Sequence, residues 1–293
     1  MQVKKVPVGF IGVGVMGKSM AGHILRAGFP VAVFSRTKQK AAELLGTGAT
    51  WCDSAGEVAR QSHVIITIVG FPTDVEQVYF GSTGILAHAA KGSVVIDMTT
   101  SSPDLAQRIY REAREKGVAA LDAPVSGGDR GAREAQLSIM VGGDAAAMES
   151  VLPILQCMGK NIVLQGPAGS GQYTKMANQI AIASGMLGVC EALAYSKKAG
   201  LDPTTVLKSI GPGAAGSWSL TNYGPRIIAG NYDPGFYVKH FIKDLKIAIE
   251  SAGRLNLDLP GLALAKAMYE RLAAKGGEDF GTHALYKLYD PQA

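Results

Sequence analysis

Residues 6–17 read Val-Pro-Val-Gly-Phe-Ile-Gly-Val-Gly-Val-Met-Gly, an apolar run followed at once by a glycine-rich turn. The amphipathic segment 18–26 comes next, so the order is buried strand, glycine turn and helix. Glycines spaced as in this turn allow a ligand to approach the backbone, and the helix N-terminus then faces a pyrophosphate. A purely structural glycine turn is the alternative. The predicted dinucleotide-binding residues are Gly12, Val13, Gly14, Val15, Met16 and Gly17.

A second apolar strand, Val31–Phe34, ends in the tripeptide Ser35-Arg36-Thr37. NAD-specific sites usually carry an acidic residue at this point for the ribose hydroxyls, and this tripeptide has none. Arg36, flanked by the hydroxyls of Ser35 and Thr37, could instead hold a 2′-phosphate through bidentate charged hydrogen bonds. The sequence therefore favours NADP as the cofactor, with NAD possible, and a solvated basic turn is the alternative interpretation.

Strand and helix patterns keep alternating after this tripeptide. The predicted strands are a short one beginning at Trp51, then 64–69, 93–97 and 118–122, and the predicted helices cover 40–45 and 54–62 and begin again near Asp74. This alternation predicts an α/β domain of the Rossmann type, with a doubly wound parallel sheet. The carboxyl ends of strands in such sheets face the ligand crevice. We therefore expect Val69, Gly70, Phe71 and Pro72 to lie beside the cofactor.

The loop after strand 93–97 carries a cluster of hydroxyl side chains ahead of Pro103. We expect Ser101 or Ser102 to cap a helix that begins at this proline, since both residue types favour helix starts. Thr100 lies closer to the strand end, where it could reach the nicotinamide ribose or the substrate.

A second polar loop, Ser126-Gly127-Gly128, follows strand 118–122, whose expected partner is 137–143. The loop offers a hydroxyl and successive backbone amides, a donor set suited to a carboxylate, although such a tripeptide is often only a loop. None of the five histidines shares a motif with Ser126, which excludes a serine-protease site.

The long apolar run from Gly169 to Gly200 predicts one continuous helix, with two lysines near its end to suit the helix dipole. Lys175, Asn178 and Gln179 stand at positions i, i+3 and i+4, so a helix places them on one face of an otherwise apolar rod. This lysine either carries its head to solvent or donates a proton or a charged hydrogen bond to a ligand, with the amides fixing its head.

Composition narrows the class of protein. The 293-residue chain is 47% hydrophobic and 18% charged, as in ordinary globular proteins. Its net charge of +5 is scattered, which argues against a nucleic-acid surface and fits a small acidic ligand. Cys52, Cys157 and Cys190 show no metal spacing, so we predict inert thiols, no metal site and a reducing compartment. The absence of a signal-peptide pattern and an uncharged helical run, 176–190, too short for a bilayer predict a cytoplasmic location without membrane association.

The rest of the chain is typical of helices, beginning with Asp202 as cap and Pro203 in the first turn. The expected helices are 203–210, 218–228, 237–255 and 260–275. We therefore predict a dinucleotide-binding domain, 1–167, and a helical substrate and oligomerisation domain, 168–293, in which 168–199 form a bridging helix. The apolar character of this half favours a homodimer or homotetramer.

Four motifs in fixed order, 9–17, 122–128, 169–178 and 243–245, resemble those of the β-hydroxyacid dehydrogenases. This family contains 3-hydroxyisobutyrate dehydrogenase, tartronate semialdehyde reductase and glyoxylate/succinic semialdehyde reductases, and the resemblance runs along essentially the whole chain. It implies hydride transfer between NADP(H) and a short 3-hydroxy acid or its semialdehyde. Burial would have to lower the pKa of the lysine if it is to act as a base at neutral pH.

The resemblance also implies roles for particular residues. Lys175 would be the catalytic proton donor and acceptor, supported by Asp244 and assisted by the adjacent amides Asn178 and Gln179. The loop 126–128 would grip the substrate carboxylate. On the ligand side, Thr100 and Lys243 would lie toward the cofactor and Phe236 would line the substrate pocket. Without the resemblance, residues 243 and 244 read as a solvated helix face.

Two departures from the family pattern leave the substrate open. Many 3-hydroxyisobutyrate enzymes have two adjacent asparagines where this chain has Asn178-Gln179, and the Ser35-Arg36-Thr37 type is similar to NADPH-using semialdehyde and glyoxylate reductases. A glyoxylate or succinic semialdehyde reductase and an L-serine dehydrogenase are the alternatives. Among other classes, 6-phosphogluconate dehydrogenases have a much longer carboxyl-terminal region, while imine reductases and a non-catalytic dinucleotide-binding adapter would lack Lys175.

Overall fold

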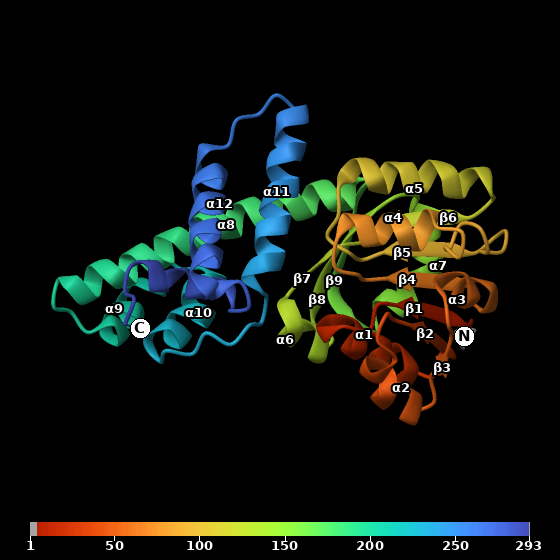
Figure 1. Ribbon diagram of the computed structural model, residues 1–293, viewed down its shortest axis with the longest axis horizontal. Helices are drawn as coiled ribbons and strands as arrows, with labels where there is room; N and C mark the ends of the chain where they lie inside the picture. Colours follow the sequence, from red (N-terminus) through yellow and green to blue (C-terminus); the bar gives the residue numbers. More distant parts are fainter. Residues whose placement is uncertain (1–4, 293) are drawn as a thin grey trace. The chain divides into compact units, whose positions relative to one another are not determined.

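The computed structural model describes residues 5–292 (Figure 1), and the chain divides after Lys175 into two compact units. The first unit is built on one sheet in the order β3-β2-β1-β4-β5-β6-β8-β7, with β9 paired to β8. The strands are β1 (Val8–Ile11), β2 (Val31–Phe34), β3 (Thr50–Trp51), β4 (Val64–Thr67), β5 (Val94–Asp97), β6 (Ala119–Asp122), β7 (Val125–Ser126), β8 (Leu137–Gly142) and β9 (Gly159–Gly166).

The first six strands are all parallel, which confirms the predicted doubly wound sheet. The far edge differs from the prediction, because β8 runs antiparallel to both β6 and β7 and parallel to β9. The expected pairing of 118–122 with 137–143 is confirmed through Asp122 and Gly142. The predicted strand at Trp51 is correct except that Trp51 ends β3 rather than beginning it.

Helices flank this sheet. They are α1 (Val15–Arg26), the short 3₁₀ turn η1 (Lys38–Ala41), α2 (Ala42–Gly46), α3 (Ala55–Gln61), α4 (Pro72–Phe80), α5 (Pro103–Glu115), α6 (Gly128–Arg133) and α7 (Ala145–Leu155). Two predicted N-caps are confirmed: the hydroxyl of Ser54 accepts the amide of Glu57 at 3.1 Å, and that of Ser102 accepts the amide of Leu105 at 3.2 Å. The helix expected near Asp74 begins two residues earlier.

Helices cover both faces of the sheet, because successive side chains of β4 pack in two different apolar clusters. Ile66 packs in a cluster with Met20 of α1 and Ile154 of α7. Its neighbour Ile65 packs in a separate cluster, with Ile109 of α5 among its members. Since successive side chains of a strand point to opposite faces, a strand buried on both sides must be apolar throughout. This arrangement leaves the carboxyl ends of the strands as the place where polar residues gather.

The second unit is helical, as predicted. Its elements are the remainder of α8 (Ser170–Lys198), then α9 (Pro203–Ile210), α10 (Trp218–Ile228), α11 (Val238–Arg254), α12 (Pro260–Leu272), η2 (Ala273–Gly277) and the 3₁₀ helix η3 (Thr282–Leu288). The helix predicted over 260–275 ends at Leu272, and the turn that follows contains Gly276 at a φ of +85°. Cys190 of α8 packs in one core with Phe241 and Tyr269, whose ring centroids are 5.0 Å apart.

By length and composition, α8 is apolar enough to cross a membrane, contrary to the expectation drawn from 176–190. Core helices meet the same criterion, and Met186, Cys190 and Leu193 on α8 are buried in the core of the second unit. The three cysteines are free, and burial raises the pKa of each thiol. The prediction of unreactive thiols is therefore supported by their environment.

Candidate cofactor and active site

The three glycines of the turn after β1, Gly12, Gly14 and Gly17, have different structural roles. A Cβ on Gly12, whose φ is +99°, would lie 2.0 Å from the carbonyl oxygen of Ile68, and one on Gly17 would lie 1.9 Å from that of Gly12. A Cβ on Gly14 would meet nothing within 4 Å. The outer two glycines therefore close the turn against β4 and seat α1. The middle one leaves open space at the start of α1, which fits a pyrophosphate approaching the helix N-terminus.

The tripeptide after β2 contacts the first turn of α4 through Arg36. A guanidinium nitrogen of Arg36 is 3.2 Å from a carboxylate oxygen of Asp74, and the Arg36 side chain is 80% exposed. Asp74 also accepts the amide of Phe71 at 3.1 Å, so it ties the start of α4 to this arginine. The guanidinium is exposed on its own side, whereas the Asp74 side chain is 18% exposed, so Arg36 remains accessible to a second anionic partner such as a phosphate.

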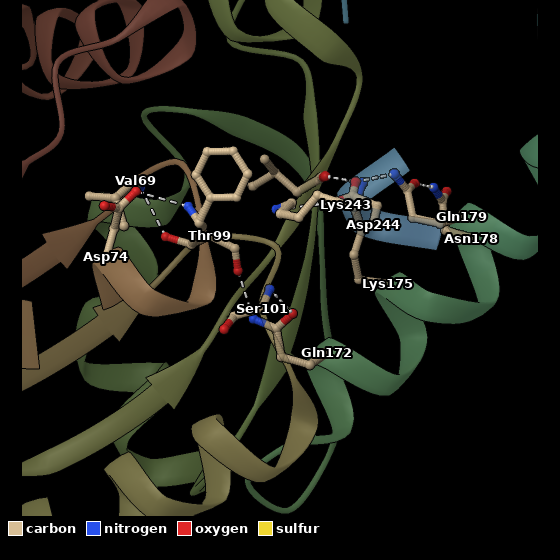
Figure 2. A network of polar contacts seen from close by, with 12 residues as sticks. Val69, Asp74, Thr99, Ser101, Gln172, Lys175, Asn178, Gln179, Lys243 and Asp244 are labelled. Carbon is tan, nitrogen blue, oxygen red and sulfur yellow. Dashed lines mark hydrogen bonds and ion pairs between the residues drawn. The ribbon is translucent and has the colours of Figure 1, made fainter. Parts of the chain in front are cut away.

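A buried polar network joins the carboxyl ends of β4 and β5. Asp97 accepts hydrogen bonds from the Thr67 hydroxyl at 2.8 Å and from the Thr99 amide at 3.1 Å. The Thr99 hydroxyl accepts the amide of Val69 at 3.0 Å (Figure 2), which holds the predicted cofactor-side segment 69–72. Burial raises the pKa of Asp97 from 3.8 to about 6, against the hydrogen bonds from the two threonines.

The first turn of α8 is fixed by Asp122 and Gln172. Asp122 accepts the amides of Gly169 at 2.7 Å and Gln172 at 2.8 Å, so a carboxylate caps the positive end of this helix. The buried Gln172 side chain donates to the carbonyl of Thr99 at 2.7 Å and accepts the amide of Ser101 at 3.0 Å (Figure 2). The loop that carries Thr100 is therefore tied to α8 on both sides of this residue.

Lys175 lies about one helical turn after Gln172 on α8, and its side chain is 7% exposed. Its Nζ donates to the carbonyl oxygen of Val125 at 2.8 Å. Ser126 follows directly, then Gly127 and Gly128 at φ of +128° and +62°, values that favour glycine, and α6 begins at Gly128. The ammonium therefore lies inside the protein beside the predicted carboxylate-binding loop.

A second polar cluster lies in the helical unit. Asn178 donates to the side-chain oxygen of Gln179 at 2.8 Å, and Gln179 donates to Asp244 at 2.5 Å (Figure 2). The Nζ of Lys243 is 2.9 Å from the other carboxylate oxygen of Asp244, which is 1% exposed. The solvated-face interpretation of Asp244 is therefore wrong. Direct support of Lys175 by Asp244 stays a prediction.

Phe236 lies in the loop before α11, where its half-buried ring meets that of Phe241 at 5.8 Å between centroids. Its role in a substrate pocket stays a prediction, as does a cofactor contact of Lys243. Over residues 5–292, the structure brings together no group of three histidine, cysteine or carboxylate side chains that could hold a metal ion.

Sequence patterns indicated no role for several members of these networks, namely Thr67, Asp97, Thr99, Asp122 and Gln172. The sequence pattern indicates Thr100, whereas the structure shows its neighbour Thr99 accepting the amide of Val69. Asp97 and Asp122 are register partners at the ends of β5 and β6. Acidic residues closing two buried parallel strands were the signal that could have pointed to a polar cluster at this edge.

Comparison with known proteins agrees with this geometry. Residues 7–166 match the family described as the NAD binding domain of 6-phosphogluconate dehydrogenase, and residues 169–289 match the NAD-binding domain of NADP-dependent 3-hydroxyisobutyrate dehydrogenase. The chain is 41% identical to 2-hydroxy-3-oxopropionate reductase of Escherichia coli K12, over 98% of both chains. It is 50% identical to a probable mitochondrial 3-hydroxyisobutyrate dehydrogenase-like protein of Arabidopsis thaliana, over 95% of this chain and 83% of the other.

Among solved structures, 3-hydroxyisobutyrate dehydrogenase of Mycobacterium tuberculosis, determined with L-serine, superposes with a TM-score of 0.89. Its sequence identity is 28%, over 97% of this chain and 99% of the other. The glycine turn, the buried lysine and these matches along nearly the whole length show that the chain is a member of the β-hydroxyacid dehydrogenase family, a group of NAD(P)-dependent oxidoreductases.

Proposed function

We propose that this enzyme interconverts a short 3-hydroxy acid and its semialdehyde, with NADP(H) as the preferred cofactor and Lys175 as proton donor and acceptor. The observation that carries the proposal is the buried Lys175 ammonium, 2.8 Å from the carbonyl of Val125 and next to Ser126. A cationic donor beside a hydroxyl and glycine amides suits a substrate that bears both a carboxylate and a reacting oxygen.

Different residues of the chain would bind the cofactor, transfer the proton and hold the substrate carboxylate. The turn 12–17 and the segment 69–72 would hold the dinucleotide, whose nicotinamide would supply the hydride chemistry for both directions of the reaction. Lys175 would take the hydroxyl proton in oxidation and give a proton to the carbonyl oxygen in reduction, so charge and atoms balance in both directions. The loop 126–128 would hold the carboxylate and orient the carbon chain.

The preference for NADP rests on Arg36. Its guanidinium lies after β2, where the ribose end of a dinucleotide is bound in folds of this type, and its present partner is the carboxylate of Asp74. A 2′-phosphate would replace that carboxylate with a bidentate partner of higher charge. The neighbouring hydroxyls of Ser35 and Thr37 would add two further donors.

The test is a spectrophotometric panel with both cofactors. We would assay 2-hydroxy-3-oxopropionate first, because the Escherichia coli relative is named for that substrate, then glyoxylate, succinic semialdehyde and methylmalonate semialdehyde. Oxidation of 3-hydroxyisobutyrate and L-serine completes the panel. Lys175→Ala should lower kcat by about a hundredfold or more while cofactor affinity stays nearly unchanged. Lys198→Ala, an exposed site in the last turn of the same helix, is the matched control. Near-normal turnover of Lys175→Ala would refute the assignment.

We also propose that the enzyme is a cytoplasmic homodimer or homotetramer. Helix α9 has no buried residue although it carries apolar side chains, and Tyr195, Leu201 and Trp218 of the same unit are each more than half exposed. Exposed apolar groups of this kind are typical of surfaces that pair. Analytical ultracentrifugation tests the proposal, and a monomer at micromolar concentration would contradict it.

A further inference from the structure

Asp74 lies where two parts of the proposed cofactor site meet. It belongs to the first turn of α4, beside the segment that follows β4 (Figure 2). One of its carboxylate oxygens accepts the backbone amide of Phe71 at 3.1 Å, and the other is 3.2 Å from a guanidinium nitrogen of Arg36. The same carboxylate therefore contacts both the segment 69–72 and the cation that follows β2.

The two partners of this ion pair are held unequally. The Asp74 side chain is 18% exposed, and it lies at the positive end of α4, where the helix dipole stabilises a carboxylate. The Arg36 side chain is 80% exposed, and over residues 5–292 its guanidinium makes no other hydrogen bond or ion pair. Asp74 is therefore the fixed partner, and Arg36 is the partner that can move away.

The charge of Asp74 acts differently on the two cofactors. A guanidinium carries five N–H donors in a planar fork and binds a phosphate best through two parallel hydrogen bonds. The Asp74 carboxylate opposes this binding, because it attracts Arg36 to itself and because its negative charge repels the phosphate. The ribose 2′-hydroxyl of NAD(H) is neutral, so neither effect weakens its binding.

We propose, on the basis of the proposed function, that Asp74 is a specificity-determining residue, which competes with the 2′-phosphate for Arg36 and so lowers the preference for NADP(H) over NAD(H). The tripeptide after β2 has no acidic residue, although NAD-specific sites usually carry one there. Helix α4 brings a carboxylate to this tripeptide from 38 residues further along the chain. An arginine typical of NADP sites is thus combined with an acidic residue that restrains it.

One substitution separates this role from the role of Asp74 at the start of α4. Asp74→Asn removes the negative charge, while the amide oxygen of asparagine can still accept the backbone amide of Phe71. The lost ion pair has an exposed partner and contributes little to stability. We therefore expect the variant to fold with a melting temperature close to that of the wild type.

The experiment measures dissociation constants by isothermal titration calorimetry. The probes are adenosine 2′,5′-bisphosphate and 5′-AMP, which differ only in the 2′-phosphate, and NADPH and NADH are titrated in parallel by fluorescence. At low ionic strength, Asp74→Asn should bind the bisphosphate about fivefold more tightly than the wild type, with 5′-AMP and NADH changed less than about twofold. Glu149→Gln, which removes a negative charge at an exposed position of α7, is the matched control and should change none of these constants.

Salt distinguishes the competition from a change of shape. In about 1 M sodium chloride, where the Debye length is about 3 Å, the gain of Asp74→Asn for the bisphosphate should fall below about twofold. A gain that is independent of salt would contradict a competition between charges.

A double variant shows whether the effect passes through the arginine. In the background of Arg36→Gln, Asp74→Asn should strengthen bisphosphate binding less than about twofold, because no guanidinium is left to release. Weaker bisphosphate binding by Arg36→Gln, combined with no gain in Asp74→Asn or an equal gain for 5′-AMP, would overturn the competition alone. Unchanged bisphosphate binding by Arg36→Gln would overturn both the competition and the proposed preference for NADP(H).

Discussion

The carboxyl group of Asp97 provides the sharpest test of the buried networks at the sheet edge. It is enclosed at the end of β5, and burial raises its pKa from 3.8 to about 6. Between these two values the folded protein keeps a proton on Asp97 that the unfolded chain has released. Raising the pH through this window therefore destabilises the fold, and the loss levels off about one pH unit above the folded-state pKa.

The magnitude follows from the size of the shift. A pKa raised from 3.8 to about 6, at 1.36 kcal/mol per pH unit, corresponds to about 3 kcal/mol of unfolding free energy in total, of which about 2 kcal/mol is lost between pH 4 and pH 7. Asp97→Asn removes the titrating group, while its side-chain oxygen can still accept the hydroxyl of Thr67 and the amide of Thr99. The stability difference between variant and wild type should therefore shift by about 2 kcal/mol in favour of the variant over this range.

Urea unfolding followed by circular dichroism at pH 4, 5, 6 and 7 measures this difference directly. Taking the variant minus the wild type cancels the contributions of all other titrating groups. Asp258→Asn, at an exposed position, removes the same formal charge without removing a buried group and should leave the pH dependence unchanged. A difference for Asp97→Asn that stays constant from pH 4 to pH 7 would show that the buried carboxyl does not titrate in this range and would refute the reasoning.

Three further substitutions test the cofactor site and the anchor of α8. Arg36→Asp should lower the ratio of kcat/KM for NADPH over NADH at least about tenfold, because it removes the partner of the 2′-phosphate; an unaltered ratio would contradict the cofactor preference. Gln172→Leu leaves the carbonyl of Thr99 and the buried amide of Ser101 without their partner. It should lower the free energy of unfolding in urea by about 2 kcal/mol or more and also lower kcat. A variant as stable as the wild type would contradict the role of Gln172 in fixing the start of α8. Gly17→Ala, whose Cβ would clash with the turn, should lower the melting temperature. Gly14→Ala should leave the melting temperature unchanged and weaken NADPH binding in a fluorescence titration. Equal losses of melting temperature in the two variants would contradict the different roles of the two glycines.

Local sequence determined the regular part of the fold. The glycine turn, the helix caps at Ser54 and Ser102 and the continuous helix α8 depend on residues close together in the chain, so their patterns predicted them correctly. The elements at the far edge of the sheet, β7, α6 and β9, were not predicted from local patterns. Residues of β9 are mostly exposed, and β7 and α6 are too short to show a period, so the usual pattern of buried side chains was missing.

The sequence by itself therefore determined a dinucleotide-binding fold and the position of Lys175 on the polar face of α8. Tertiary structure alone decided what surrounds that lysine. Gln172 meets a carbonyl 73 residues earlier, and Gln179 meets a carboxylate 65 residues later. The direction of a hydrogen bond between two amides depends on which group stands at the far end, and in this chain that group, Asp244, is brought to α8 only by the packing of α11.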